Sequence, residues 1–244
     1  MYLLVHADSD REYLRAPGDE LQTDLGVIEI PDDIEPGDVL TTHLGEEFRV
    51  RPLRGPDCFE HFERTGAPMM PRDVGLVIGH TGPAAGDRAL DVGTGTGVLA
   101  AYLGRLGVAV TTYERDPEFA DVARENMRLA GVGDRVEVRT GDATDDVDAL
   151  TDPGGFDLLT LDTADAPALV SRAPDLLVPG GFAAVYSPFV ESTRDAADAA
   201  RDAGLDGVET FETIQRRMQF DERGSRPATA GVGHTGYLTF ARRP

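Results

Sequence analysis

The chain has 244 residues and a formal net charge of −21, with 44 acidic side chains against 23 basic ones. Its hydrophobic content of 41% is enough for a sizeable core, so the length suits one large domain or one domain with a smaller partner. No apolar run approaches the ~18 residues of a membrane span, and the N-terminal residues lack the features of a signal peptide. The single Cys58 and five scattered histidines show no metal-ligand spacing. We therefore expect a cytoplasmic protein with no metal and no membrane contact.

The charged residues have an unusual composition. Every basic residue is Arg, Lys is absent, and Asp outnumbers Glu by 28 to 16. Short, strongly hydrated carboxylates suit a protein that stays soluble in concentrated salt, where charge repulsion is screened within ~3 Å at 1 M. We interpret this composition as halophilic, and the alternative is an ordinary acidic protein. The dependence of the melting temperature on KCl distinguishes the two.

Residues 1–66 are predicted to form a small β-rich domain. Short runs rich in Val, Ile, Leu, Tyr and Phe, separated by Asp, Gly and Pro, are typical of antiparallel strands. These runs cover residues 2–6, 12–16, 26–30, 38–44 and 47–53. A short linker around 64–68 follows, and residues 67–244 would form the second, larger domain.

From residue 71 onward, helical and strand patterns alternate. Helices are predicted over 71–80, 98–106, 117–130, 166–177 and 193–203. Strands are predicted over 88–92, 108–113, 135–140, 156–162, 182–187, 208–214 and 236–243. Asp116 is a capping residue for the third helix and Gly131 is its stop signal. The alternation predicts an α/β, Rossmann-like fold with a mixed seven-stranded sheet.

A glycine-rich loop, Asp91-Val92-Gly93-Thr94-Gly95-Thr96-Gly97, joins the first strand of this sheet to the next helix. Glycines at this point let the backbone approach a ligand closely. A dinucleotide-binding loop would need its third glycine at position 98, which is Val98, and no Lys follows as in a phosphate-binding loop. On its own, such a loop is as consistent with a structural turn as with a ligand site.

Carboxylates at the ends of the next two strands favour a ligand site. Glu114 ends the second strand and can accept hydrogen bonds from both hydroxyls of a ribose. Asp142 follows the third strand, where it can meet the amino group of an adenine, with the backbone of Ala143 beside it. Either acid alone would be interpreted as a solvated surface charge. Together with the loop they predict an S-adenosylmethionine (SAM) site formed by Asp91, Gly93, Thr94, Gly95, Thr96, Gly97, Val98, Leu99, Glu114, Asp142, Ala143 and Asp162.

The fourth strand ends at a single carboxylate, Asp162. In a sheet of this kind that strand end lies beside the reacting methyl group, so Asp162 is the candidate catalytic residue. A carboxylate there can hold an exocyclic amine and stabilise a developing cation. A helix cap or a cofactor-side acid is the alternative. The segment lacks the Asp/Asn-Pro-Pro-aromatic pattern that amino-methylating enzymes of nucleic acids often carry.

The C-terminal segment 226–243, RPATAGVGHTGYLTFARR, is the most specific feature of the chain. It resembles the tRNA (adenine-N1)-methyltransferases that modify T-loop adenines. Arg54-Gly55 and Pro71-Arg72-Asp73 are similar to the Arg-Gly and Tyr-Pro-Lys-Asp segments of that family. The resemblance implies SAM-dependent methylation of adenine N1 at tRNA position 57 or 58, a homotetramer, and a catalytic Asp at Asp162. The target base would have to leave its stack.

Two departures from the family pattern bear on the exact substrate. Met70 stands where the family has Tyr, and the family's Asp-Leu-Pro is Asp162-Thr163-Ala164 here. Alternative functions are a methyltransferase acting on protein (isoaspartate type) or on a small molecule, and a non-catalytic subunit that binds SAM or RNA. Candidate RNA contacts, which could equally be solvated or paired with carboxylates, are Arg49, Arg51, Arg54, Arg216, Arg217, Arg223 and Arg226.

Overall fold

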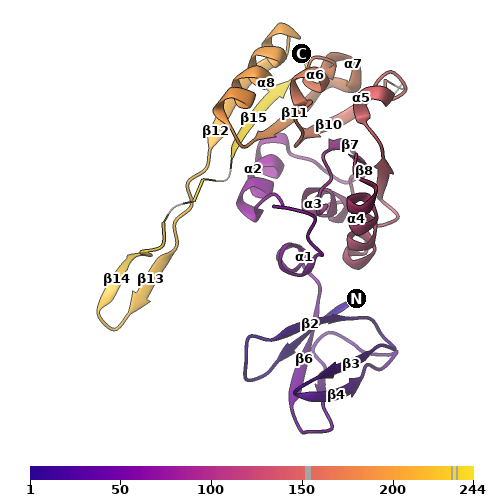
Figure 1. The fold of residues 1–244 in the computed structure, drawn as a ribbon, viewed down its shortest axis with the longest axis vertical. Coiled ribbons are helices and arrows are strands. Elements are labelled where there is room, and N and C mark those ends of the chain that lie inside the picture. The colour runs from indigo at the N-terminus through magenta and orange to yellow at the C-terminus, as the bar shows by residue number, and fades with distance from the viewer. Residues whose placement is uncertain (152–154, 232, 235) are drawn as a thin grey trace.

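The computed structural model describes residues 1–151, 155–231, 233–234 and 236–244. The chain forms three parts in space: a small N-terminal β body, a larger body built on a seven-stranded sheet, and a hairpin that extends away from both (Figure 1). Among these described residues, no helix is long and apolar enough to cross a membrane. Within the C-terminal segment, Val232 and Thr235 lie outside the described residues.

The N-terminal β body contains an antiparallel sheet with the strand order β2-β1-β6-β5 and a separate hairpin, β3-β4. The strands are β1 (Tyr2–His6), β2 (Glu12–Arg15), β3 (Glu20–Thr23), β4 (Gly26–Glu29), β5 (Val39–Thr41) and β6 (Glu47–Pro52). They enclose a core of their own, formed by Leu4, Leu21, Ile28, Ile30, Ile34, Phe48 and Val50. The β3 strand was not predicted, because Leu21 is its only buried residue and a single apolar position makes no pattern.

A short helix that was not predicted, α1 (Gly55–His61), follows β6. Leu53, Cys58 and Phe62 are buried in the same cluster as the helices of the larger body. The Arg105 side chain on the larger body donates to the carbonyl of Leu53 at 3.0 Å. This connecting segment therefore packs against the larger body rather than against the N-terminal core.

The larger sheet has the strand order β12-β15-β11-β10-β7-β8-β9, and β15 is antiparallel to both of its neighbours. Its strands are β7 (Arg88–Val92), β8 (Ala109–Glu114), β9 (Val136–Thr140), β10 (Phe156–Leu161), β11 (Leu177–Ser187), β12 (Asp206–Glu212) and β15 (Tyr237–Arg242). The neighbouring pairs from β11 to β9 are parallel, so their carboxyl ends meet at one edge. The predicted mixed seven-stranded α/β sheet is confirmed.

Helices cover both faces of this sheet. The elements are α2 (Pro71–Thr81), α3 (Val98–Arg105), α4 (Pro117–Ala130), α5 (Ala143–Asp146), α6 (Ala166–Val170), α7 (Ala173–Leu176) and α8 (Val190–Asp202). Buried residues of α2, α3 and α4 belong to one apolar cluster, and those of α6, α7 and α8 to the other. The boundaries of α4 match the prediction: the Asp116 carboxylate accepts from the N–H of Glu118 at 2.9 Å, and Gly131 ends the helix with φ 69°.

The single helix predicted over 166–177 is wrong. The structure has two short helices there, α6 and α7, each with a proline in its first turn. Proline is well placed at a helix start but lacks the N–H needed inside a helix, so Pro174 begins a new helix instead of continuing the first. The following strand, β11, starts at Leu177, five residues earlier than expected.

The extended hairpin was also not predicted. It consists of β13 (Met218–Asp221) and β14 (Gly224–Pro227), and we call residues 214–227 the arm. All residues of both strands are exposed, including Phe220 at 76%. Since neither strand has a buried face, the sequence lacks the alternating pattern that predicts a strand.

Candidate functional site

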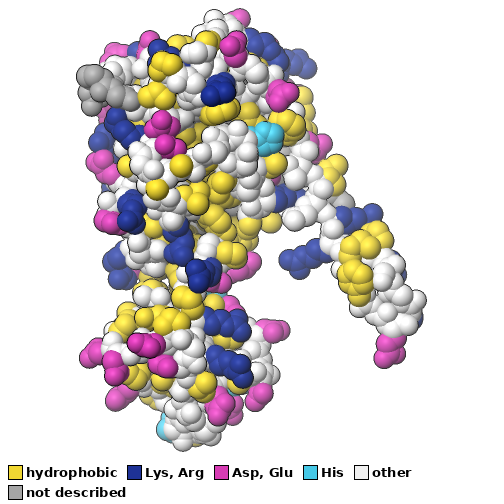
Figure 2. Space-filling view, turned by 180° about the vertical axis from the view of Figure 1, so that it is seen from behind, with side chains coloured by type: hydrophobic (Ala, Val, Ile, Leu, Met, Phe, Trp, Pro, Cys, Tyr) yellow, Lys and Arg dark blue, Asp and Glu magenta, His cyan; other side chains and the backbone are white. Residues whose placement is uncertain are grey.

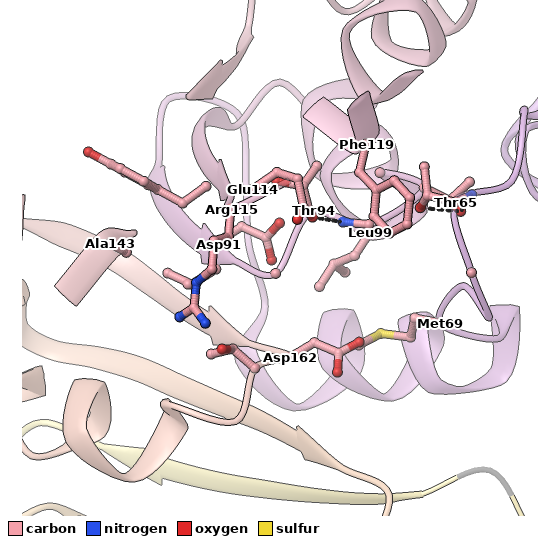
Figure 3. A pocket seen from close by; sticks show the side chains of 18 of the residues that line it. Thr65, Met69, Asp91, Thr94, Leu99, Glu114, Arg115, Phe119, Ala143 and Asp162 are labelled. Atoms are coloured by element: carbon pink, nitrogen blue, oxygen red, sulfur yellow. Dashed lines mark hydrogen bonds between the residues drawn. The ribbon is translucent and has the colours of Figure 1, made fainter. Parts of the chain in front are cut away.

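A cleft of about 330 Å³ opens at the carboxyl ends of β7, β8, β9 and β10 (Figure 3). Its size falls within the range of small-molecule sites, which is roughly 300–1,000 Å³. The cleft is lined by every residue of the predicted cofactor site: Asp91, Gly93, Thr94, Gly95, Thr96, Gly97, Val98, Leu99, Glu114, Asp142, Ala143 and Asp162. Further lining residues that were not predicted include 65–69, Arg115, Phe119 and Asp165.

The glycine-rich loop brings two strand ends into direct contact. Gly93 has φ 96°, and a Cβ atom on it would lie 2.1 Å from the carbonyl oxygen of Asp162. Gly97 has φ 82°, and a Cβ atom there would lie 2.6 Å from Cε of Met127. Both positions therefore favour glycine for backbone conformation. At Gly93 the clash is with backbone and also excludes a side chain for space, whereas at Gly97 the end of the flexible Met127 side chain can shift. The loop therefore packs closely against Asp162 and Met127 as well as lining the cleft.

Asp91 joins three strands beneath the loop. Its Oδ2 accepts from the hydroxyl of Thr112 on β8 at 2.6 Å, and its Oδ1 accepts from Thr160 on β10 at 2.5 Å. The hydroxyls of Thr94 and Thr112 are 2.5 Å apart, which extends the network into the loop. Burial raises the pKa of Asp91, while the two hydroxyl hydrogen bonds oppose that rise. Asp91 thus holds the carboxyl ends of the strands in register.

Glu114 is held over the glycine-rich loop. Its Oε2 accepts from the N–H of Gly95 at 2.8 Å, and its Oε1 accepts from the N–H of Asp116 at 3.1 Å. The half-buried carboxylate has lone pairs left for further donors. The geometry therefore fixes the carboxylate beside the cleft and leaves it able to accept from a diol.

Asp142 caps α5 and is paired with a residue that sequence reasoning missed. Its Oδ1 accepts from the N–H of Thr144 at 2.9 Å, and its Oδ2 lies 2.8 Å from Nη2 of Arg115. These contacts, first with Thr144 and then with Arg115, lower the pKa of Asp142. The same guanidinium nitrogen lies 2.5 Å from Oδ2 of Asp165. Arg115 therefore links the ends of three strands and is the one basic residue among the described lining residues.

Asp162 stands at the end of β10 and lines the open cleft, to which it is exposed. Its N–H donates to the carbonyl of Val92 at 2.8 Å, which continues the ladder between β10 and β7. Partial desolvation by the surrounding walls of the cleft, and then the charge of Asp91, raise the pKa of Asp162 to about 7. A carboxyl group poised near neutrality in a cleft is typical of functional sites.

The segment Pro71-Arg72-Asp73 begins α2 at the same edge of the sheet. Asp73 is buried, and its Oδ2 lies 3.7 Å from Nε of Arg72. Burial and then the charges of Asp162 and Asp73 raise the pKa of Tyr186 on β11, so its hydroxyl lies in the field of both carboxylates. Met70 precedes α2 and is 37% exposed.

His234, in the C-terminal segment, lies beside the ends of β11 and β12. Its Nδ1 lies 3.1 Å from Oε1 of Glu212, and its Nε2 lies 3.0 Å from the carbonyl oxygen of Pro188. These two contacts raise the pKa of His234. Its contacts are with the ends of β11 and β12, which agrees with a structural role.

The linker before α2 forms one wall of the cleft because Asn126 holds it there. The side chain of Asn126 is fully buried on α4 and donates to the carbonyls of Glu63 at 3.0 Å and Thr96 at 2.9 Å. Its Oδ1 accepts from the N–H of Glu63 at 3.1 Å. The N–H of Thr65 also donates to the hydroxyl of Thr96 at 3.3 Å. The linker and the glycine-rich loop are therefore tied through one amide.

Sequence reasoning missed Phe119 and Arg115 for different reasons. Phe119 has the helical spacing of the apolar face of α4, but the structure leaves it 39% exposed in the cleft wall. Arg115 looked like one more surface charge, and its position directly after Glu114 was the one available signal. Among the residues that the structure describes, no group of His, Cys, Asp and Glu is placed to hold a metal ion.

The candidate RNA-contacting arginines lie away from the cleft. Arg49, Arg51 and Arg54 are exposed on or just after β6. Arg216, Arg217, Arg223 and Arg226 are exposed on the arm. Figure 2 shows basic side chains on both the N-terminal β body and the arm, with acidic side chains among them.

Comparison with known proteins gives concordant relatives. The family described as a methyltransferase domain matches residues 89–181. The tRNA (adenine(57)-N(1)/adenine(58)-N(1))-methyltransferase TrmI of Methanocaldococcus jannaschii is 31% identical, and the match covers 99% of this chain and 94% of that protein. The tRNA (adenine(58)-N(1))-methyltransferase TrmI of Thermus thermophilus is 27% identical over 85% of this chain and 82% of its own.

A solved structure with the same fold covers nearly the whole chain. The SAM-dependent O-methyltransferase of Thermotoga maritima superposes with a TM-score of 0.80 at 24% identity, covering 99% of this chain and 92% of that one. At this identity the likeness shows the fold alone. The β-rich N-terminal strands and the arm are therefore included in a fold known from solved structures.

Proposed function

Because the chain belongs to the tRNA (adenine-N1)-methyltransferase family, we propose that it transfers a methyl group from SAM to N1 of an adenine in the T-loop of tRNA, at position 57 or 58. The observation that carries this proposal is the contact between Gly93 and Asp162. It holds a carboxyl group with a pKa near neutrality against a loop suited to a nucleoside cofactor. The family relationship also extends over 99% of the chain, beyond the part shared by methyltransferases in general.

The residues of the cleft fit SAM. The glycines of the loop place no side chain in the cleft that they line, Glu114 presents two carboxylate oxygens to a ribose diol, and Asp142 can accept from an adenine amino group. When bound, SAM supplies a methyl group on a positively charged sulfonium, which a nitrogen lone pair can take in a single displacement. The carboxylates of the cleft complement that charge. We propose all twelve predicted cofactor residues as the SAM site.

We propose Asp162 as the catalytic residue. N1 of adenine has a free lone pair at neutral pH, so no general base is required for the attack. Positive charge develops on the base as its new N–C bond forms, and the ionised Asp162 carboxylate can hold the exocyclic amine and stabilise that charge. The remaining contribution is positioning of a base that has left its stack.

One experiment tests the function against its alternatives. The protein is incubated with methyl-labelled SAM and unmodified tRNA, and the labelled nucleoside is mapped. Label on N1 of a T-loop adenine is the expected result. Label in protein, with isoaspartyl peptides as substrate, or in a small molecule would support the second hypothesis. SAM binding with no labelled acceptor would support a non-catalytic subunit.

We further propose that the protein is a homotetramer. The arm supports self-association, because a two-stranded hairpin with no core is marginal on its own. It exposes large apolar side chains, namely Ile214, Met218 and Phe220. Light scattering measures the mass directly, and deletion of the arm should then reduce it. A wild-type mass equal to 26.1 kDa would contradict the proposal.

Three further proposals follow from the composition and the contacts. We propose that the protein works in the cytoplasm, where its tRNA substrate is found, and that it is adapted to concentrated salt. We also propose residues 1–66 and 67–244 as domains; the separate apolar cluster of the N-terminal β body supports two domains, although Leu53, Cys58 and Phe62 pack with the larger body. Limited proteolysis near residue 66 tests the boundary.

A further inference from the structure

A large aromatic side chain lies exposed just after β11. Phe189 is 67% exposed, and Val190 beside it is 49% exposed. Single exposed apolar residues are ordinary on a protein surface and need no explanation on their own. The significance of Phe189 therefore depends on how it is supported and where it lies.

The backbone at Phe189 is held firmly. Its carbonyl accepts from the N–H of Thr193 at 3.0 Å, from the hydroxyl of Thr193 at 2.7 Å and from the hydroxyl of Ser192 at 3.0 Å. The carbonyl of the preceding residue, Pro188, contacts Nε2 of His234 at 3.0 Å. Phe189 is thus the N-cap residue of α8. Its backbone is fixed by hydrogen bonds, while its ring is exposed.

The ring lies at the same edge of the sheet as Asp162. β10 and β11 are parallel, with Leu161 opposite Val185, so the residues after Val185 run alongside those after Leu161. The next residue, Tyr186, lies within the field of the Asp162 carboxylate, as the cause of its raised pKa shows. Phe189 follows three residues later at this edge of the sheet, outside the residues that line the cleft itself.

We propose that Phe189 is a stacking platform for an RNA base displaced from its helix, a role that rests on the proposed function. A base that leaves its stack to reach Asp162 loses its neighbours, and an exposed aromatic face at the same edge of the sheet can replace one of them. Stacking also needs no positive charge. This matters in a chain whose net charge of −21 repels the phosphates of RNA.

An RNA base fits this site better than a second copy of the chain. Phe189 and Val190 are flanked by the polar residues Ser192 and His234, so the apolar area is small. A stable subunit interface needs a far larger patch, and the apolar side chains of the arm supply a better candidate for one. One exposed ring in a polar surround is the size of a single base.

The chain contains no Trp, so a substitution gives a fluorophore at one known position. We expect the fluorescence of Phe189→Trp to be quenched on titration with unmodified tRNA, because a base stacks on the indole. The matched control is Leu106→Trp, at the end of α3 remote from the glycine-rich loop and 41% exposed. Quenching at position 189 and not at 106 supports the proposal, and equal or absent quenching overturns it.

Kinetics supply a second readout. We expect Phe189→Ala to raise KM for tRNA at least fivefold and to leave the Kd of SAM unchanged, while Phe189→Tyr retains the wild-type KM. Val190→Ala is the neighbouring control and should have little effect. An unchanged KM in Phe189→Ala overturns the platform. A reduced particle mass in that variant also overturns it, because the ring would then be a subunit contact.

Failure of this proposal is distinguishable from failure of the proposed function. A wild-type protein that methylates tRNA with no quenching at position 189 refutes the platform alone. A wild-type protein that leaves tRNA unlabelled refutes the proposed function, and the platform is refuted with it.

Discussion

Gly93 and Asp162 meet backbone to backbone at the carboxyl ends of β7 and β10. A Cβ atom on Gly93 would lie 2.1 Å from the carbonyl oxygen of Asp162. The position of the proposed catalytic carboxylate therefore depends on the absence of a side chain at residue 93. Because the clashing atom is backbone, no rotamer change can relieve the overlap.

We expect Gly93→Ala to abolish methyl transfer and to weaken SAM binding at least tenfold. The substitution adds the clash with Asp162 to a residue that has φ 96°, a conformation costing on the order of 1–3 kcal/mol for a side chain. Calorimetry measures the binding and thermal unfolding measures the stability. Gly133→Ala is the matched control, since no atom lies within 4 Å of its added Cβ. Full activity in Gly93→Ala would show that Asp162 can move without loss of methyl transfer.

The raised pKa of Asp162 predicts a specific pH profile. We expect kcat/KM to rise with pH through about 7, because the ionised carboxylate is the form that stabilises the developing cation. Asp162→Asn should keep SAM binding, lower turnover about 100-fold and flatten this profile. A variant with wild-type turnover would remove Asp162 from the mechanism.

The same group also affects stability, and the sign is opposite to that of a salt-bridged Asp. Its folded pKa is above the unfolded one, so between pH 4 and 7 the folded state binds more protons than the unfolded state. The contribution of Asp162 to stability is therefore greatest at low pH and falls as pH rises to about 7. Chemical denaturation of Asp162→Asn should lack this fall, and an identical slope in both proteins would contradict the assignment.

The elements that the sequence predicted well carry local signals. The helix α4 has a capping Asp116, a proline at its start and Gly131 at its end, and its boundaries agree with the prediction. The cleft residues were found because the carboxyl ends of parallel strands meet at one edge. The helix α1 was missed because contacts with residues distant in the sequence stabilise it. The arm was missed because its strands are exposed on both faces and show no apolar alternation. Phe119 shows the limit of periodicity, which identifies an apolar face but not whether that face meets a core or a cleft.

Removal of Arg115 should change the balance between the cofactor and its demethylated product. Arg115 is the one cation among the described lining residues, and it pairs with Asp142 and Asp165. SAM carries a net positive charge and S-adenosylhomocysteine carries none. We therefore expect Arg115→Gln to favour SAM over the product several-fold in low salt, since charges within ~8 Å still interact there.

Calorimetric titration of both ligands measures this ratio. Arg128→Gln is the control, because the exposed Arg128 pairs with Glu125 at 2.6 Å within α4. The shift should disappear in molar KCl, where screening is strong. An unchanged ratio in low salt would mean that Arg115 does not influence the charge at the cofactor.

Asn126 should be needed both for stability and for the shape of the cleft. Asn126→Ala leaves the backbone groups of Glu63 and Thr96 without their partner, at a cost of about 1–3 kcal/mol for each buried group left unsatisfied. We expect a lower melting temperature and weaker SAM binding, since the linker wall is released. Asn126→Asp retains only the acceptor for the N–H of Glu63, and its two donated bonds are lost. An unchanged affinity for SAM in the Ala variant would show that the linker wall is held by other contacts.

The acidic composition predicts that stability rises with salt. The 44 carboxylates repel one another in dilute buffer, and KCl screens that repulsion while leaving short ion pairs less affected. We expect the melting temperature to increase steadily from 0.1 to 2 M KCl. Sucrose at equal osmotic strength should stabilise less, because it does not screen charge.

A charge variant makes the test specific to repulsion. Asp195→Asn with Asp202→Asn neutralises two exposed positions of α8 and should raise the melting temperature in dilute buffer, with a smaller gain from KCl. Equal melting temperatures of the wild-type protein in dilute buffer and molar KCl would reject salt adaptation, and the composition would then describe an ordinary acidic protein.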